Sequence, residues 1–212
     1  MIIAVDGPAA SGKGTLSRRL AGHFGLSYLD TGRTYRAVAA VLRDGDLPLD
    51  VPEVAVSAAN ALDLDGLDAL DLANAEVAEA ASKVAVMPQL RTALVARQRA
   101  FAQDAERTGN GAVLDGRDIG TVVCPDASVK IFVTAAPEAR ARRRALELYG
   151  TEEGEAYEQL LADLKVRDAR DANRPVGALR PAEDAHVLDT TMLSIAAALD
   201  AAIGLVENAR AD

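Results

Sequence analysis

The stretch that decides the fold is residues 7–15, which read GPAASGKGT. An apolar run at 2–5 precedes it, and residues 14–24 repeat leucine and phenylalanine at helical spacing. Glycines between a strand and a helix let successive backbone N–H groups point at one anion, while the helix N-terminus and the lysine add positive charge. We therefore expect a phosphate-binding loop, or P-loop, that binds ATP. Its residues are Gly7, Pro8, Ala9, Ala10, Ser11, Gly12, Lys13, Gly14 and Thr15.

The loop differs in one detail from the commonest P-loop pattern. Lys13 is followed by Gly14, and the hydroxyl comes one residue later, at Thr15. This order resembles nucleoside-monophosphate kinases more than GTPases or motor ATPases. The sequence also lacks the N/T-K-x-D motif with which GTPases read their base, which argues against a switch GTPase. A glycine-rich turn that matches by chance is the alternative interpretation.

The rest of the chain alternates short apolar runs with helical patterns. We expect strands at 2–5, 27–29, 112–114, 129–133 and 187–188, and helices at 14–24, 33–43, 89–106, 137–149, 155–171 and 194–209. Strands that alternate with helices imply a parallel sheet covered on both faces. The predicted fold is therefore a three-layer α/β/α domain of the P-loop NTPase type.

Composition excludes several classes of protein. The 212 residues are 50% hydrophobic and contain 23 basic and 32 acidic side chains, a net charge of −9. This balance argues against a disordered chain and against a general binder of nucleic acid or membranes. A single cysteine, Cys124, excludes an intramolecular disulfide, and the five apolar residues at the N-terminus are no signal peptide. We expect a cytoplasmic protein.

Charge is distributed unevenly. Residues 44–82 contain ten acidic side chains and no lysine or arginine, which favours an insert with a solvated face. Of the 23 basic residues, 19 are arginine, and eight of these lie between 140 and 180. Arginine suits bidentate recognition of phosphate. Coding bias is the alternative, and composition alone does not decide.

Two motifs favour a second phosphate site beside the loop. Residues 30–36 (DTGRTYR) begin a helix with a hydroxyl and an arginine, although a plain helix cap has the same pattern. In 112–121 (AVLDGRDIGT), Asp115 ends an apolar strand, where open α/β sheets bind ligands, and can orient Mg²⁺ or its waters. Arg117 and Asp118 would then project toward an acceptor. The alternative is a tight turn with an internal Arg–Asp pair.

These motifs together resemble the bacterial cytidylate kinases, which act on CMP and dCMP. The resemblance spans nearly the whole chain. Besides GPAASGKGT it rests on YLDTGRTYR (28–36), ASKVAVMPQLR (81–91), RQRAF (97–101), LDGRDIGTVV (114–123), VKIFVTAAPEARARRR (129–144), RDARDANR (167–174) and VLDTT (187–191).

The resemblance implies one P-loop kinase domain over 1–212, with 44–82 as the insert that binds the nucleoside monophosphate and about 140–174 as an arginine-rich lid. It implies in-line transfer of the ATP γ-phosphoryl group to CMP or dCMP with Mg²⁺, by a monomer that uses small molecules and neither a nucleic-acid polymer nor a membrane. The alternatives are a small P-loop kinase for UMP, AMP or a metabolite, and a non-catalytic nucleotide-binding regulator.

The resemblance also assigns roles to residues. Thr31, Arg36, Arg117 and Arg174 would hold the CMP phosphate; Ser82, Arg91 and Asp118 would read the base; Arg167 and Asp171 would contact the ribose. Lys13, Asp115, Arg117, Arg140 and Arg144 would be catalytic, and Thr15 and Asp115 would bind the metal, Asp115 directly or through water. A helix cap at Ser82 and solvated faces at Arg91 and Arg142 are the alternatives.

Two departures from the family pattern stand out. Threonine replaces the usual serine at Thr31, and the acidic segment is short, with no clear β-hairpin expected between 64 and 76.

Overall fold

The strands and helices follow the predicted alternation. The computed structural model describes residues 1–64, 66–67, 70, 72 and 74–211. The strands are β1 (Ile2–Asp6), β2 (Ser27–Asp30), β3 (Ala112–Gly116), β4 (Val129–Thr134) and β5 (His186–Asp189). The α-helices are α1 (Lys13–Phe24), α2 (Thr31–Asp44), α3 (Pro52–Ala61), α4 (Ala75–Val84), α5 (Pro88–Arg107), α6 (Pro137–Tyr149), α7 (Glu155–Ala172) and α8 (Ile195–Ala211), and a π-helix, η2, spans Ile119–Val123.

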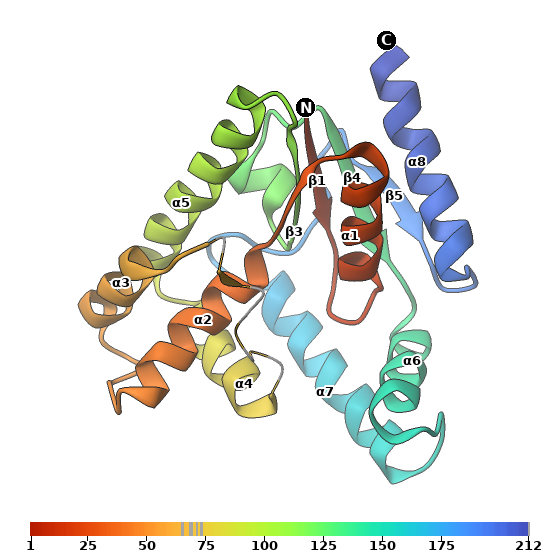
Figure 1. The fold of residues 1–212 in the computed structure, drawn as a ribbon. Coiled ribbons are helices and arrows are strands. Elements are labelled where there is room, and N and C mark those ends of the chain that lie inside the picture. The colour runs from red at the N-terminus through yellow and green to blue at the C-terminus, as the bar shows by residue number, and fades with distance from the viewer. Residues whose placement is uncertain (65, 68–69, 71, 73, 212) are drawn as a thin grey trace. The chain divides into compact units, whose positions relative to one another are not determined.

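The five strands form one sheet in the order β2-β3-β1-β4-β5. Strand β1 lies at its centre and pairs in parallel with β3 and β4, which places Val5 opposite both Asp115 and Ile131. Helices α1 and α8 lie side by side on one face (Figure 1), where their apolar side chains pack on Ile3, Val5 and their neighbours. Ala4 and Leu114 point to the other face and are also fully buried. The predicted α/β class is confirmed.

The chain divides into two compact units. One comprises Met1–Leu29 with Ala105–Asp212 and holds the P-loop, and the other comprises Asp30–Asp104. The second unit has its own core, in which α2, α3, α4 and α5 bury residues such as Leu42, Val84 and Leu94. It begins before residue 44 and ends after residue 82, and the assignment of 44–82 as an acceptor-binding insert stays a prediction.

Three elements were absent from the sequence-based expectation. Helix α3 lies within the acidic segment and helix α4 overlaps its end, where prolines and a loose pattern of Ala, Leu and Asp favour an irregular insert. The π-helix η2 follows β3 directly. The expectation that no β-hairpin forms between 64 and 76 concerns a segment of which 65, 68, 69, 71 and 73 lie outside the described residues.

Arginines from the flanks tie the acidic segment to its unit. Arg33 donates from Nη2 to the carbonyl oxygens of Leu67 and Leu70 at 2.7 and 2.9 Å. Arg97 donates to the carbonyl oxygens at the end of α3, and Arg43 pairs with Glu76. Among the acids of 44–82, Glu76 is thus paired with an arginine from outside the segment.

The turn before β3 requires a glycine. Gly111 has φ +79°, and a Cβ there would lie 2.1 Å from the Met1 carbonyl oxygen, an oxygen that accepts a hydrogen bond from Ala112 N. We predict that Gly111→Ala lowers the free energy of unfolding by about 2–4 kcal/mol, because left-handed backbone and overpacking are both unfavourable. Urea denaturation at 25 °C measures it.

The matched control is Gly22→Ala, in an exposed position of α1 where an added Cβ meets open space. There alanine should raise stability by about 0.5–1 kcal/mol. Equal changes in the two variants would contradict the role of the turn.

Candidate active site

The P-loop leaves β1 after Asp6 and enters α1 at Lys13 (Figure 1). A Cβ on Gly7 would lie 2.1 Å from the Val133 carbonyl oxygen on β4, so only glycine fits where the loop turns away from the sheet. Ala10 (φ 58°) and Gly12 (φ 85°) adopt left-handed backbone. Gly12 precedes α1 and has no side chain to cap the N–H groups of the first turn, an end of a helix that favours an anion.

Lys13 and Asp115 form an ion pair between the loop and the end of β3. Lys13 Nζ lies 3.5 Å from Asp115 Oδ1, and their side chains are 12% and 4% exposed. Tyr28 donates its hydroxyl to Asp115 Oδ2 at 3.4 Å. A Cβ on Gly14 would lie 3.2 Å from that oxygen, so the glycine after the lysine lets α1 approach the carboxylate closely. The loop thus has a cation and a fixed carboxylate side by side.

The oxygen atoms beside the loop suit Mg²⁺ better than they suit a metal ion that is coordinated by protein side chains alone. In the described ranges, no three His, Cys, Asp or Glu side chains are grouped as a metal site. Mg²⁺ usually binds one or two carboxylates together with waters and substrate phosphates. Asp115 supplies such a carboxylate, and Thr15 lies exposed in the first turn of α1 with its hydroxyl.

Asp6 is a buried carboxyl that was not predicted as a site residue. Its two oxygens accept hydrogen bonds from Ile119 N and Gly120 N, both at 2.8 Å, and it is 5% exposed. Burial raises the pKa of Asp6 to about 6; the two backbone N–H groups lower it, and the nearby Asp118 and Asp115 carboxylates raise it. Asp6 therefore fixes the start of η2, directly after Arg117 and Asp118.

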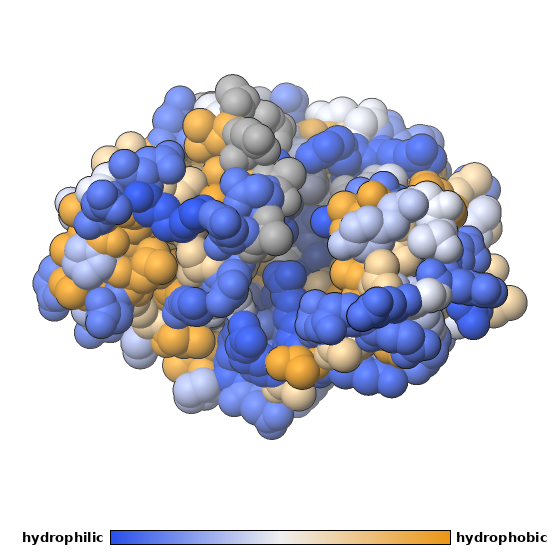
Figure 2. Space-filling view, turned by 90° about the horizontal axis from the view of Figure 1, so that it is seen from below, coloured by the Kyte–Doolittle hydropathy of each residue, from blue (hydrophilic) through white to orange (hydrophobic). Residues whose placement is uncertain are grey.

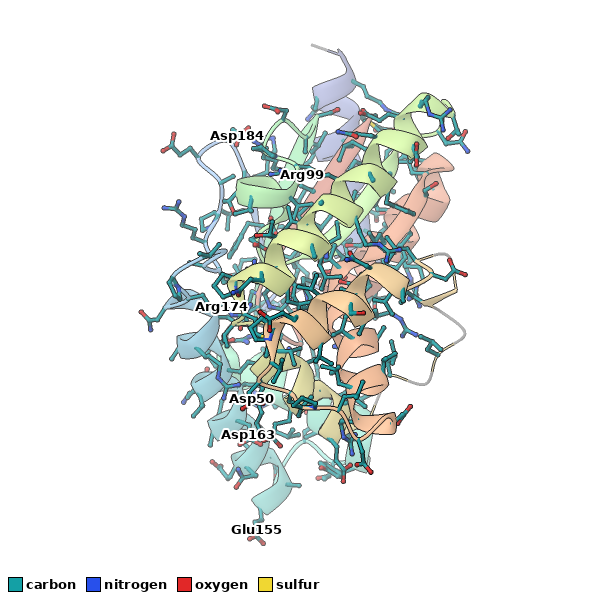
Figure 3. The ribbon with its side chains drawn as sticks, turned by 90° about the vertical axis from the view of Figure 1, so that its left-hand side faces the viewer. Asp50, Arg99, Glu155, Asp163, Arg174 and Asp184 are labelled. Carbon is teal, nitrogen blue, oxygen red and sulfur yellow. The ribbon has the colours of Figure 1, made fainter. Side chains whose placement is uncertain are left out.

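Arginines from two segments converge on Asp171, near the C-terminal end of α7. This carboxylate is 1% exposed and lies 3.0 Å from Arg117 Nε, 2.5 Å from Arg174 Nη2 and 4.0 Å from Arg167 Nε. Figure 3 shows α7 running from Glu155 past Asp163, with Arg174 beyond its far end. Asp171 thus gathers three guanidinium groups at one place, and guanidinium groups suit the recognition of carboxylate and phosphate oxygens.

The arginines of α6 differ in their surroundings. Arg140 is 2% exposed, and its guanidinium donates to protein oxygens. Arg143 donates to the carbonyl oxygens of Thr190 and Thr191. Arg144 is more exposed and pairs with Glu147 at 2.8 Å. Figure 2 shows hydrophobic side chains among hydrophilic ones on the face seen from below, and Leu146, Leu148 and Val166 of α6 and α7 are exposed.

Four predicted acceptor residues lie in the second unit. Thr31 begins α2 and is 5% exposed; Thr34 Oγ1 donates to its carbonyl oxygen at 2.7 Å and accepts from Gln98 Nε2 at 3.0 Å. This buried chain, which the sequence did not reveal, fixes the start of α2. Arg36 lies on the same helix and is half-buried.

Arg91 and Ser82 occupy sites that exclude the alternatives considered for them. Arg91 is 5% exposed, with its guanidinium 5.8 Å from the centre of the Tyr35 ring, so a solvated face is wrong. Ser82 lies inside α4, whose caps are Asn74 and Ala85, so a helix cap is wrong as well.

The comparisons with known proteins agree with these motifs. The family model for cytidylate kinase matches residues 3–208. The chain belongs to the cytidylate kinase family. A cytidylate kinase of Brucella ovis is 57% identical over 210 residues, 99% of this chain and 94% of that protein, and one of Brucella abortus is 56% identical over the same length. The predicted resemblance is confirmed.

Two solved structures support the fold alone. An uncharacterized protein from Eubacterium ventriosum aligns with a TM-score of 0.55 at 13% identity and covers 98% of both chains. A sugar kinase from Janibacter sp. aligns with a TM-score of 0.50 at 14% identity, over 97% of this chain and 94% of its own.

The raised pKa of Asp6 makes stability depend on pH. The unfolded chain ionises this carboxyl near 3.8 and the folded protein near 6. Its contribution to the free energy of unfolding is therefore complete below pH 3.8 and is lost as the pH rises through 6, by about 3 kcal/mol.

Urea denaturation of wild type and Asp6→Asn between pH 4 and 7 measures this loss, because asparagine does not titrate. Relative to the variant, the wild type should lose stability as the pH rises. Parallel profiles would show that Asp6 does not titrate in this range.

Proposed function

We propose that this protein transfers the γ-phosphoryl group of Mg·ATP to the phosphate of CMP or dCMP, forming ADP and CDP or dCDP. The observation that carries the proposal is one unit that holds both a P-loop with its Lys13–Asp115 pair and an arginine cluster around Asp171, in a chain of the cytidylate kinase family. The first group suits a triphosphate, and the second suits a phosphate monoester.

On the donor side, the N–H groups of residues 7–15 and the Lys13 ammonium bind the β- and γ-phosphates. Thr15 and Asp115 are the proposed ligands of Mg²⁺, with Asp115 acting directly or through water. When bound, Mg²⁺ neutralises charge on the β- and γ-phosphate oxygens. Tyr28, which donates to Asp115, keeps that carboxylate oriented.

On the acceptor side, Thr31, Arg36, Arg117 and Arg174 are the proposed partners of the CMP phosphate. Ser82, Arg91 and Asp118 are the proposed partners of the cytosine base. Its amino group can donate to a carboxylate, and its O2 and N3 can accept from a guanidinium or a hydroxyl. Arg167 and Asp171 contact the ribose. Arg91 and Asp171 are both buried charged groups. Burial of a charge is unfavourable unless the group is paired, and such groups concentrate at functional sites, which supports these roles.

The chemical step needs no protein base. The acceptor phosphate is largely dianionic at neutral pH, since its second pKa is about 6. One of its oxygens forms a bond to the γ-phosphorus as the bond from that phosphorus to the β,γ-bridging oxygen breaks, and the electron pair leaves with ADP. Lys13, Arg117 and Arg144 stabilise the charge on the transferred group.

We further propose the organisation that these roles require: one kinase domain over 1–212, with 44–82 as the acceptor insert and about 140–174 as a lid. We propose that it acts as a cytoplasmic monomer on small molecules alone. No helix in the described part of the chain combines the length and the apolar character of a membrane span.

Removal of the loop cation tests the P-loop. Lys13→Ala should lower kcat by about 10²–10³ or more without unfolding the protein, because the ammonium acts on charge that develops in the transition state. Lys83→Ala is the matched control, an exposed lysine of α4 paired with Glu79. ADP release with CMP and thermal unfolding are measured for both variants; near-normal turnover in Lys13→Ala would refute the assignment.

A panel of acceptors tests base recognition. The rate of ADP release should be at least several-fold higher with CMP and dCMP than with UMP and AMP. Asp118→Asn should narrow the CMP-to-UMP ratio of kcat/KM by about tenfold or more, since a charge-assisted hydrogen bond to the cytosine amino group is lost. Asp126→Asn, at an exposed loop position, is the control. Equal activity on all acceptors in the wild type would refute the proposed substrate.

A further inference from the structure

The carbonyl groups on the outer side of the P-loop also need hydrogen-bond donors. When loop N–H groups face an anion, some carbonyl groups face the opposite way and need donors of their own. The Ala9 carbonyl oxygen accepts from Arg140 Nη1 at 3.1 Å, and the Ser11 carbonyl oxygen accepts from Thr190 Oγ1 at 3.1 Å. The loop is thus supported from behind by side chains that come from α6 and from the segment after β5.

Arg140 is held in place by Asp168 of α7. Arg140 Nη1 and Nη2 donate to the two Asp168 carboxylate oxygens at 3.1 and 2.5 Å, and Arg140 Nε donates to the Ala135 carbonyl oxygen at 2.9 Å. The Arg140 side chain is 3% exposed and that of Asp168 is 26% exposed. A bidentate pair of this kind fixes the plane of the guanidinium, and therefore the direction in which Nη1 donates to Ala9.

Apolar packing holds the same elements together. Ala9 of the loop packs with Ala141 of α6 and Leu164 of α7, and Ala10, Tyr157 and Leu161 pack against this cluster. The Arg140–Asp168 pair is therefore next to a direct contact between the loop and the α6–α7 pair. The orientation of this pair therefore affects the loop and not only the outer surface.

We propose that Asp168 is a positioning residue for phosphoryl transfer, which through Arg140 sets the orientation of the P-loop at Ala9. The inference rests on the proposed function and adds to it a residue that touches neither substrate. It also assigns Arg140 a role other than direct contact with phosphate, because most of its guanidinium N–H groups already donate to protein oxygens.

Asp168 lies one helical turn before Asp171, which holds Arg117 at 3.0 Å. Helix α7 thus supports the donor loop through one carboxylate and the proposed acceptor arginines through the next. Neutralising Asp168 leaves the Asp171 pair intact, so the effect should fall on ATP and not on CMP.

The test compares Asp168→Asn with Asp163→Asn, an exposed aspartate of the same helix that accepts from Gln159 at 2.8 Å. We expect KM for ATP to rise about tenfold or more in Asp168→Asn, since a partly buried charge-assisted pair is broken, while KM for CMP stays within about twofold. Calorimetric titration with ATP alone should show the same loss of affinity. Asp163→Asn should match the wild type in all three.

A purely structural role would lower the amount of active protein and leave both KM values unchanged. That result, or equal ATP affinity in the two variants, would overturn the proposal. Should Asp168→Asn fail to fold, Asp168→Glu keeps the charge but shifts it by one methylene, and an intermediate rise in KM for ATP is expected; an unchanged value overturns the proposal.

The outcome is separable from that of the proposed function. Wild-type protein that transfers no phosphate to CMP would refute the function, while the calorimetric comparison would still decide whether Asp168 orients the loop for ATP.

Discussion

The structure depends on one constraint, the orientation of the backbone between β1 and α1. Successive N–H groups between residues 7 and 15 must point at an anion, and this leaves carbonyl groups of the loop to be satisfied from the far side. At the sheet, the loop needs Gly7, whose α-carbon passes so close to Val133 that no side chain fits. On the outer side, Arg140 and Thr190 donate hydrogen bonds to carbonyl groups of the loop. Since β1 lies between β3 and β4, both neighbouring strands end beside the loop, where β3 provides Asp115 and β4 provides Val133.

A second principle is the pairing of cations with carboxylates that are buried or partly buried. Asp115 pairs with Lys13, Asp168 with Arg140, and Asp171 with the arginines around it. Each carboxylate offsets the penalty of burying a cation and fixes its direction, which is how a protein with a net charge of −9 can bind phosphates. The acidic segment at 44–82 raises the total negative charge, and arginines from its flanks hold it in the other unit. Total charge therefore says little about the local field at the loop.

Much of this could be predicted from local sequence. The loop with its strand and helix has a fixed spacing of glycines and lysine, so residues 2–24 were predicted nearly to their bounds. The alternation of the later strands with helices along the chain was predicted as well, and their order in the sheet was not. What could not be predicted depends on contacts between distant residues. Asp6 accepts from Ile119, 113 residues away, and no local pattern marks η2. Arg140 has the sequence pattern of a phosphate ligand, and only the structure shows that Asp168 and Ala9 occupy its donors. Helices α3 and α4 were not expected, because the pattern of Ala, Leu and Asp around them is loose and prolines precede α3.

The most direct test of the central claim is hydrogen exchange of the backbone amides with and without Mg²⁺ and a non-hydrolysable ATP analogue. If the N–H groups of the loop bind the phosphates, protection should be concentrated in peptides that cover residues 7–15. Peptides from α3 should be unaffected. Saturating binding of the analogue, measured by calorimetry, with unchanged exchange across residues 7–15 would contradict the account.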